Sequence, residues 1–106
     1  MEKIILLQQN VTNFLEDLIL ILFEKEYFGF EEDAQLYVKN IYDFIEYELI
    51  HFPYKTTPKK LIALGANYAF YKSNTRTTWY VFFEKFDNRY LVTYITNNHA
   101  EIIQYL

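Results

Sequence analysis

The spacing of apolar residues changes between the two halves of this 106-residue chain, and the change limits which folds it can adopt. Val11, Leu15, Leu18 and Leu22 recur at intervals of three and four, which is typical of one face of a helix. After Pro53, stretches dense in Tyr, Phe, Val, Ile and Thr favour strands instead. The order predicts an α+β domain over residues 1–106, with helices before a sheet.

Two helices are expected in the first half. The first should cover residues 11–27, with Asn10 or Thr12 as its N-cap and Gly29 able to end it. The short apolar run Lys3–Leu7 fits either an initial strand or an extension of that helix.

The acidic cluster Glu31-Glu32-Asp33 is favourable at the N-terminus of a second helix. Ala34, Val38 and Ile41 continue an apolar stripe at helical spacing. This helix should end near Ile50, before Pro53.

Three strands are expected in the second half: residues 67–72, 78–85 and 90–96. Asp87-Asn88 suits a two-residue hairpin turn, which would place Phe83 opposite Val92 and Val81 opposite Tyr94. The segment from His99 to the end fits either a helical turn or a short strand.

Composition excludes several functional classes. The absence of cysteine excludes thiol catalysis, disulfides and cysteine zinc sites, and two glycines are too few for a glycine-rich phosphate loop. The apolar run Leu18–Phe23 is much shorter than the roughly twenty residues that cross a membrane. We therefore expect a cytoplasmic protein that uses no metal and no cofactor.

The net charge of −4 divides unevenly along the chain. Residues 1–53 carry 3 basic and 11 acidic side chains, a net −8, whereas residues 54–106 carry 7 basic and 3 acidic ones, a net +4. Such a division is typical of a protein with one anion-facing surface, and equally of a solvated acidic helix beside an ordinary sheet. Any anion-binding surface is expected in the second half.

Several local motifs together resemble one protein family. They are Phe52-Pro53, the aromatic strand 79–84, the hairpin arm 87–95, Asn98-His99 and Tyr105-Leu106. In this order they resemble the RelE/ParE toxin superfamily of type II toxin–antitoxin pairs, which includes plasmid-stabilisation proteins. The resemblance spans nearly the whole chain. It implies a short N-terminal strand and a two-helix hairpin packed on a small antiparallel sheet.

The resemblance implies two activities and one partner. RelE-like members cleave messenger RNA on the ribosome, whereas ParE-like members inhibit DNA gyrase by binding it. The implied partner is a cognate antitoxin that wraps the toxin as an extended segment. RelE-like enzymes commonly carry an arginine where this chain has Thr78-Trp79-Tyr80. That departure favours an alternative, a non-catalytic protein-interaction module on a toxin-derived scaffold.

For RNA cleavage the resemblance implies four catalytic residues. His99 would act as the acid/base group, since imidazole exchanges protons near neutral pH. Arg76 and Arg89 would stabilise charge on the phosphate, and Tyr105 would stack on a base. The alternative for His99 is an ordinary surface position beside Asn98 at the end of a strand.

Four lysines are candidate RNA contacts: Lys59, Lys60, Lys72 and Lys85. Lysine also protects strand edges from aggregation, which explains such residues without RNA. The segment Tyr68-Ala69-Phe70-Tyr71-Lys72 fits a base-stacking platform, and it fits ordinary core packing as well.

Overall fold

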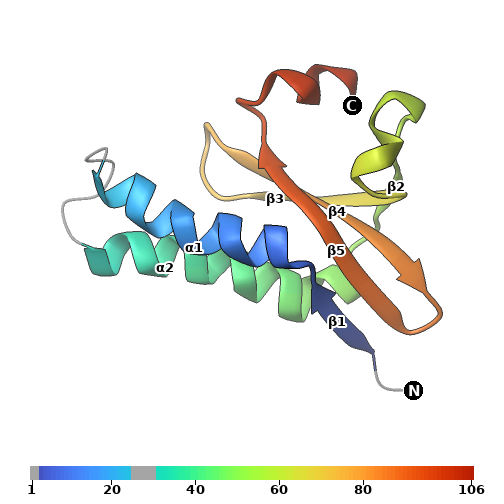
Figure 1. The fold of residues 1–106 in the computed structure, drawn as a ribbon, viewed down its shortest axis with the longest axis horizontal. Helices are drawn as coiled ribbons and strands as arrows, with labels where there is room; N and C mark the ends of the chain where they lie inside the picture. Colours follow the sequence, from blue (N-terminus) through green and yellow to red (C-terminus); the bar gives the residue numbers. More distant parts are fainter. Residues whose placement is uncertain (1–2, 25–30) are drawn as a thin grey trace.

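The computed structural model describes residues 3–24 and 31–106. The chain forms an α+β fold (Figure 1). Its helices and strands are β1 (Ile4–Leu7), α1 (Gln9–Glu24), α2 (Glu31–Asp43), β2 (Lys55–Thr56), β3 (Asn67–Lys72), β4 (Thr78–Phe86) and β5 (Arg89–Asn97). Helix α2 continues as a π-helical turn, η1 (Phe44–Glu48), and a 3₁₀ turn, η2 (Leu49–His51). Two further 3₁₀ helices are η3 (Lys59–Leu64) and η4 (Glu101–Tyr105).

The five strands form one mixed sheet in the order β1-β5-β4-β3-β2. Strand β1 pairs in parallel with β5, with Ile5 opposite Tyr90, and the other pairs are antiparallel. The expectation of a purely antiparallel sheet is therefore wrong. Parallel neighbours require a long connection, and the segment with both helices separates β1 from the rest of the sheet.

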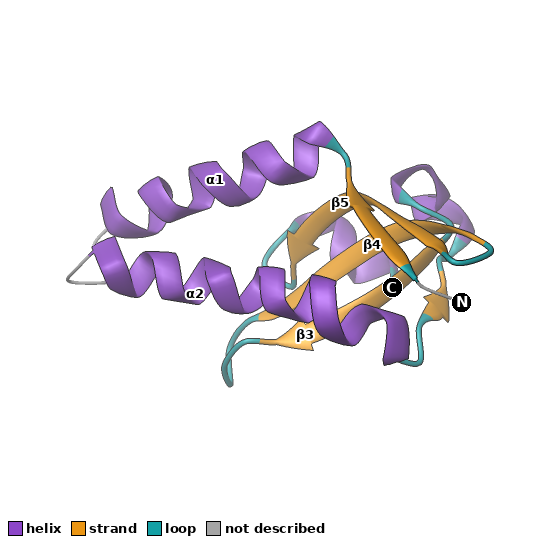
Figure 2. Ribbon diagram, turned by 90° about the horizontal axis from the view of Figure 1, so that it is seen from below, coloured by secondary structure: helices purple, strands orange, loops and turns teal. Residues whose placement is uncertain are grey.

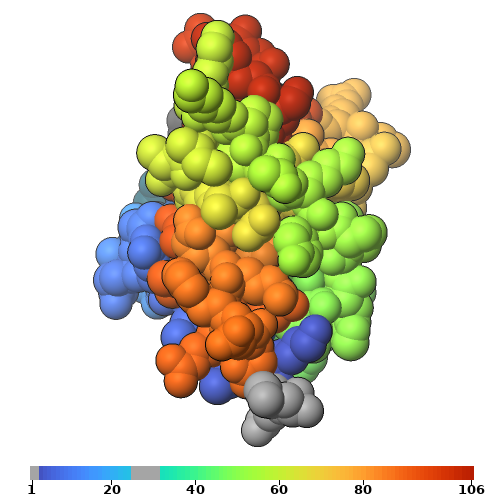
Figure 3. Space-filling model, turned by 90° about the vertical axis from the view of Figure 1, so that its right-hand side faces the viewer, coloured from blue at the N-terminus to red at the C-terminus, as the bar shows by residue number. Residues whose placement is uncertain are grey.

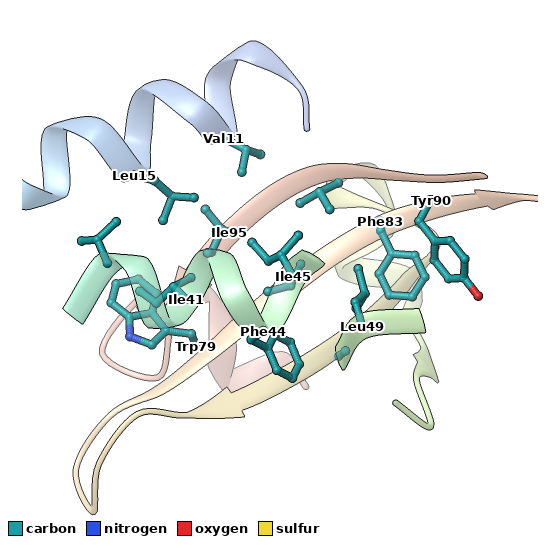
Figure 4. Close-up of a cluster of buried hydrophobic side chains, with 14 of the residues drawn as sticks. Val11, Leu15, Ile41, Phe44, Ile45, Leu49, Trp79, Phe83, Tyr90 and Ile95 are labelled. Carbon is teal, nitrogen blue, oxygen red and sulfur yellow. The ribbon is translucent and has the colours of Figure 1, made fainter. Parts of the chain in front are cut away.

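Helices α1 and α2 lie against one face of the sheet and extend beyond it (Figure 2). Their apolar stripes enclose the main core with residues from β3, β4 and β5. Leu15, Ile41 and Ile45 are fully buried there, next to Trp79 and Phe83 (Figure 4). The helical spacing of apolar residues in the first half thus serves one continuous core.

The other face of the sheet carries a smaller apolar cluster. Tyr68 and Phe82 pack there against Ile103 of η4, with Leu64 of η3 and Leu106 at its border. Because this cover is small, part of the face stays open. The alternation of side chains along β3 places Tyr68, Phe70 and Lys72 on this open face and Ala69 and Tyr71 on the helix-covered one.

The first helix begins earlier than expected. The Val11 and Thr12 amides already donate to the Gln8 carbonyl, so α1 starts at Gln9. Asn10 is not an N-cap, because its amide donates at 3.0 Å to the Thr93 carbonyl on β5. The expected end at residues 25–27 and the stop at Gly29 lie outside the described residues.

The second helical segment begins at Glu31 as expected and remains helical to His51, one residue past the expected end. It changes from α to π geometry at Phe44. Phe44, Ile45 and Leu49 are all buried in this part.

The β4–β5 hairpin follows the expected register only near its turn. Asp87 has a positive φ of 53°, and Phe83 lies opposite Val92 as expected. Val81 lies opposite Ile95 rather than Tyr94, because the register shifts by one residue between Phe82 and Phe83. This bulge keeps Val92 and Ile95 on the helix-covered face.

The remaining segments settle two open points. Residues 4–7 form a strand, and the tail after His99 forms the short helix η4. Strand β2 was not expected. No helix among the described residues is both long and apolar enough to span a membrane.

Candidate nucleic-acid interface

A groove of about 350 Å³ runs over the open face of β2, β3 and β4. Strand pairing brings its residues together, since Lys55 lies opposite Tyr68 and Phe70 lies opposite Tyr80. The full lining is Lys55, Tyr68, Phe70, Lys72, Thr78, Tyr80 and Leu106. The groove therefore combines two ammonium groups with three aromatic rings.

The aromatic rings form a tilted floor. The centroids of Tyr68 and Tyr80 are 6.3 Å apart, and those of Phe70 and Tyr80 are 6.4 Å apart. Phe70 remains 37% exposed although it is fully apolar. Exposed rings on a flat strand surface can stack on flat partners such as nucleic-acid bases.

Positive charge borders this floor on two sides. The Lys55 ammonium lies 5.9 Å from the centroid of the Phe70 ring, and Lys72 ends β3 on the same face. Of the three acids in residues 54–106, Glu84 accepts the Ala66 amide at 2.9 Å. Two flexible cations beside stacked rings match the phosphates that flank an unpaired base.

A second hollow, of about 470 Å³, adjoins the end of this groove. It is lined by Asn74, Thr75, Arg76, Thr77 and His99. Lys72 and Thr78, which line the groove, bound the loop 73–77 that supplies most of this hollow. The two hollows therefore share one end of β3 and β4.

Local hydrogen bonds hold the loop and the His99 turn together. The Asn74 side chain accepts the Arg76 and Thr77 amides at 2.8 and 2.9 Å. The Asn98 side chain accepts the Thr78 amide at 2.9 Å and donates to the Arg76 carbonyl at 3.0 Å. These bonds fix the main chain that carries Arg76 next to the turn that carries His99.

His99 itself is exposed, and its Nε2 atom lies 3.2 Å from the Thr77 hydroxyl. The imidazole and the Arg76 guanidinium line the same hollow. Together they offer a group that exchanges protons and a group that stabilises anionic charge. Of the four residues expected to be catalytic, the structure brings these two together.

The other two lie elsewhere. Arg89 begins β5 beside the hairpin turn, whereas His99 follows the other end of that strand. Eight residues from Arg89 to Asn97, at about 3.3 Å each, place the two ends roughly 26 Å apart. Tyr105 lies on η4, where the Lys60 ammonium is 4.6 Å from its ring centroid.

The four lysine candidates also separate. Lys72 lines the groove, and Lys59 and Lys60 begin η3, which packs beside η4 at one end of the molecule (Figure 3). Lys85 lies opposite Tyr90 near the β4–β5 turn, at the other end in the same view. The structure therefore places Lys85 and Arg89 away from both hollows.

Two groove residues were missed from the sequence alone. Lys55 belongs to the two-residue strand β2, which is too short to show a periodic pattern. Tyr80 stands in a strand in which nearly every residue is apolar, so the sequence does not show which of its residues face the groove. The signal that was present is the alternation of Tyr68, Phe70 and Lys72.

Within residues 3–24 and 31–106, no group of three or more His, Asp or Glu side chains is placed to hold a metal ion. Comparisons with protein-family models, with curated proteins and with solved structures found no match to this chain.

Proposed function

We propose that this protein is the toxin-like component of a bacterial toxin–antitoxin pair and acts on ribosome-associated messenger RNA. The observation that carries the proposal is the groove on the open sheet face, where Lys55 and Lys72 flank the rings of Phe70 and Tyr80. Aromatic rings beside flexible cations suit single-stranded RNA, whose bases are free to stack.

The second hollow would supply the chemistry. Cleavage by the ribose 2′-hydroxyl needs a proton acceptor and a cation that stabilises charge on the phosphate. His99 would accept the proton, with the Thr77 hydroxyl 3.2 Å from Nε2 holding the ring. Arg76, in the same hollow, would stabilise the phosphate. A strand of RNA lying along the groove would pass from Lys72 directly to this hollow.

A second candidate function is a non-catalytic protein-interaction module. Large apolar side chains are exposed on the helices that extend beyond the sheet: Leu20 at 52%, Ile21 at 45% and Leu36 at 57%. Exposed apolar surface of this kind favours a protein partner, such as an antitoxin or DNA gyrase. The distance of Arg89 from His99 also favours this alternative.

Induced expression in a bacterial host separates these functions. An RNA-directed toxin should arrest growth, and pulse labelling should show that protein synthesis stops before DNA synthesis. His99→Ala should relieve the arrest, whereas the matched control His51→Ala, which alters an exposed residue at the end of η2, should leave it. Normal growth with abundant folded protein would contradict a toxin role, and early loss of DNA synthesis would favour gyrase.

A further inference from the structure

A chain of hydrogen bonds links helix α2 to the loop beside His99. The Trp79 indole N–H donates to the Tyr37 hydroxyl oxygen at 2.9 Å, and the Tyr37 and Ser73 hydroxyls are 2.8 Å apart. The Ser73 hydroxyl in turn donates to the Thr77 carbonyl at 3.2 Å. Thr77 is the residue whose own hydroxyl lies beside His99 Nε2.

The direction of this chain follows from the chemistry of its members. An indole nitrogen can only donate, so Tyr37 accepts from Trp79. Ser73 has one hydroxyl proton, and it is used on the Thr77 carbonyl. The Tyr37 hydroxyl therefore donates to Ser73, and all three side chains are fully engaged.

We propose that Tyr37 is a positioning residue for His99, a role that rests on the proposed cleavage of RNA. The loop has its own closing bonds, including Ser73 amide to Thr77 carbonyl at 3.0 Å, and these set its internal shape. Tyr37 adds a tie between that loop and α2. It sets how the Thr77 hydroxyl stands relative to the sheet, and so where the imidazole is held.

The packing around Tyr37 makes this tie rigid. Its ring makes an edge contact with Trp79, with centroids 6.4 Å apart, and Trp79 is only 2% exposed. Loss of the hydroxyl would leave the buried indole N–H and the Ser73 hydroxyl without this partner. A shift of Ser73 toward another acceptor would then move the Thr77 carbonyl as well.

The test compares Tyr37→Phe with the matched control Tyr42→Phe. Both changes remove one phenolic oxygen from a half-buried position on α2, and Tyr42 has no role in the chain to His99. The readout is the imidazole ¹H–¹⁵N spectrum of the folded protein. The chain contains two histidines, so His51 serves as an internal reference.

We expect the His99 signals to move in Tyr37→Phe and to stay in Tyr42→Phe, with the His51 signals unchanged in both. Ser73→Ala, which breaks the next link but leaves Tyr37 in place, should move the same signals and keeps the test usable if Tyr37→Phe folds poorly. Unchanged His99 signals in the folded variants would overturn the proposal.

RNA cleavage by the purified protein supplies the second readout. Tyr37→Phe should lower kcat by roughly ten- to a hundredfold while KM stays constant, because a small displacement of a catalytic group slows the chemical step. Cleavage at the wild-type rate would overturn the positioning role. If the wild-type protein cleaves no RNA but the His99 signals still move, the proposed function fails while the link from Tyr37 to His99 stands.

Discussion

Removal of the two groove lysines should weaken RNA binding by an amount that the groove itself sets. Lys55 and Lys72 line the same hollow, and each can neutralise one phosphate of a bound strand. For single strands each phosphate contact contributes about 0.7 to the slope of log K against log salt, so Lys55→Gln/Lys72→Gln should reduce the slope by about 1.4. At 0.1 M salt that corresponds to a loss of roughly 25-fold in affinity.

The assay is fluorescence anisotropy of a labelled single-stranded RNA, titrated with protein at several salt concentrations. A 2′-O-methyl oligonucleotide is used so that no cleavage occurs during the titration. The matched control is Lys3→Gln/Lys39→Gln, which removes the same charge from β1's flank and from α2, where Lys39 pairs with Asp43 at 2.8 Å.

The control should keep the wild-type slope. Equal losses in both double variants would show that binding follows net charge alone and would refute a localised groove. An unchanged affinity in Lys55→Gln/Lys72→Gln would refute RNA binding at this face altogether. Tyr80→Leu, which removes a ring without changing charge, should lower affinity with an unchanged slope.

Three further predictions concern stability and are checked by urea unfolding. Gly65→Ala should destabilise the fold by about 2–4 kcal/mol, because the new Cβ would lie 2.7 Å from the Thr93 hydroxyl and 2.8 Å from the Phe83 amide nitrogen; a change below about 0.5 kcal/mol would contradict this. Thr57→Val should stabilise by about 1 kcal/mol, because the buried Thr57 hydroxyl has no hydrogen-bond partner among the described residues, and a loss of stability would contradict it. Burial raises the pKa of Tyr71 above its ordinary 10.0. The folded state thus holds this proton more tightly, so stability should fall as pH rises above about 10, and less steeply in Tyr71→Phe; identical pH profiles would contradict it.

The elements with strong local patterns were predictable from the sequence. The three long strands were placed within a residue or two of their observed bounds, because Tyr, Phe, Val, Ile and Thr dominate them. The acidic start of α2 was also correct. Strand β2 and helix η3 could not be predicted in this way, since short elements hold their form through tertiary contacts rather than through a repeating pattern.

The candidate site was only partly predictable. Lys72, Arg76 and His99 were named from their types and positions, and the structure places them along one end of β3 and β4. Arg89 was named on the same grounds, and it lies at the opposite end of β5. Residue type cannot separate these cases, because both arginines adjoin strands and only the pairing of the strands sets their distance from His99.

By itself, the sequence determined the division into an acidic helical half and a basic strand half, since both follow from local spacing and charge. The tertiary structure alone decided that Lys55 meets Lys72, that β1 joins β5 in parallel, and that Tyr37 reaches Ser73 across 36 residues. Each of these contacts joins segments that are distant in sequence. Their formation depends on how whole faces pack, which no local periodicity records.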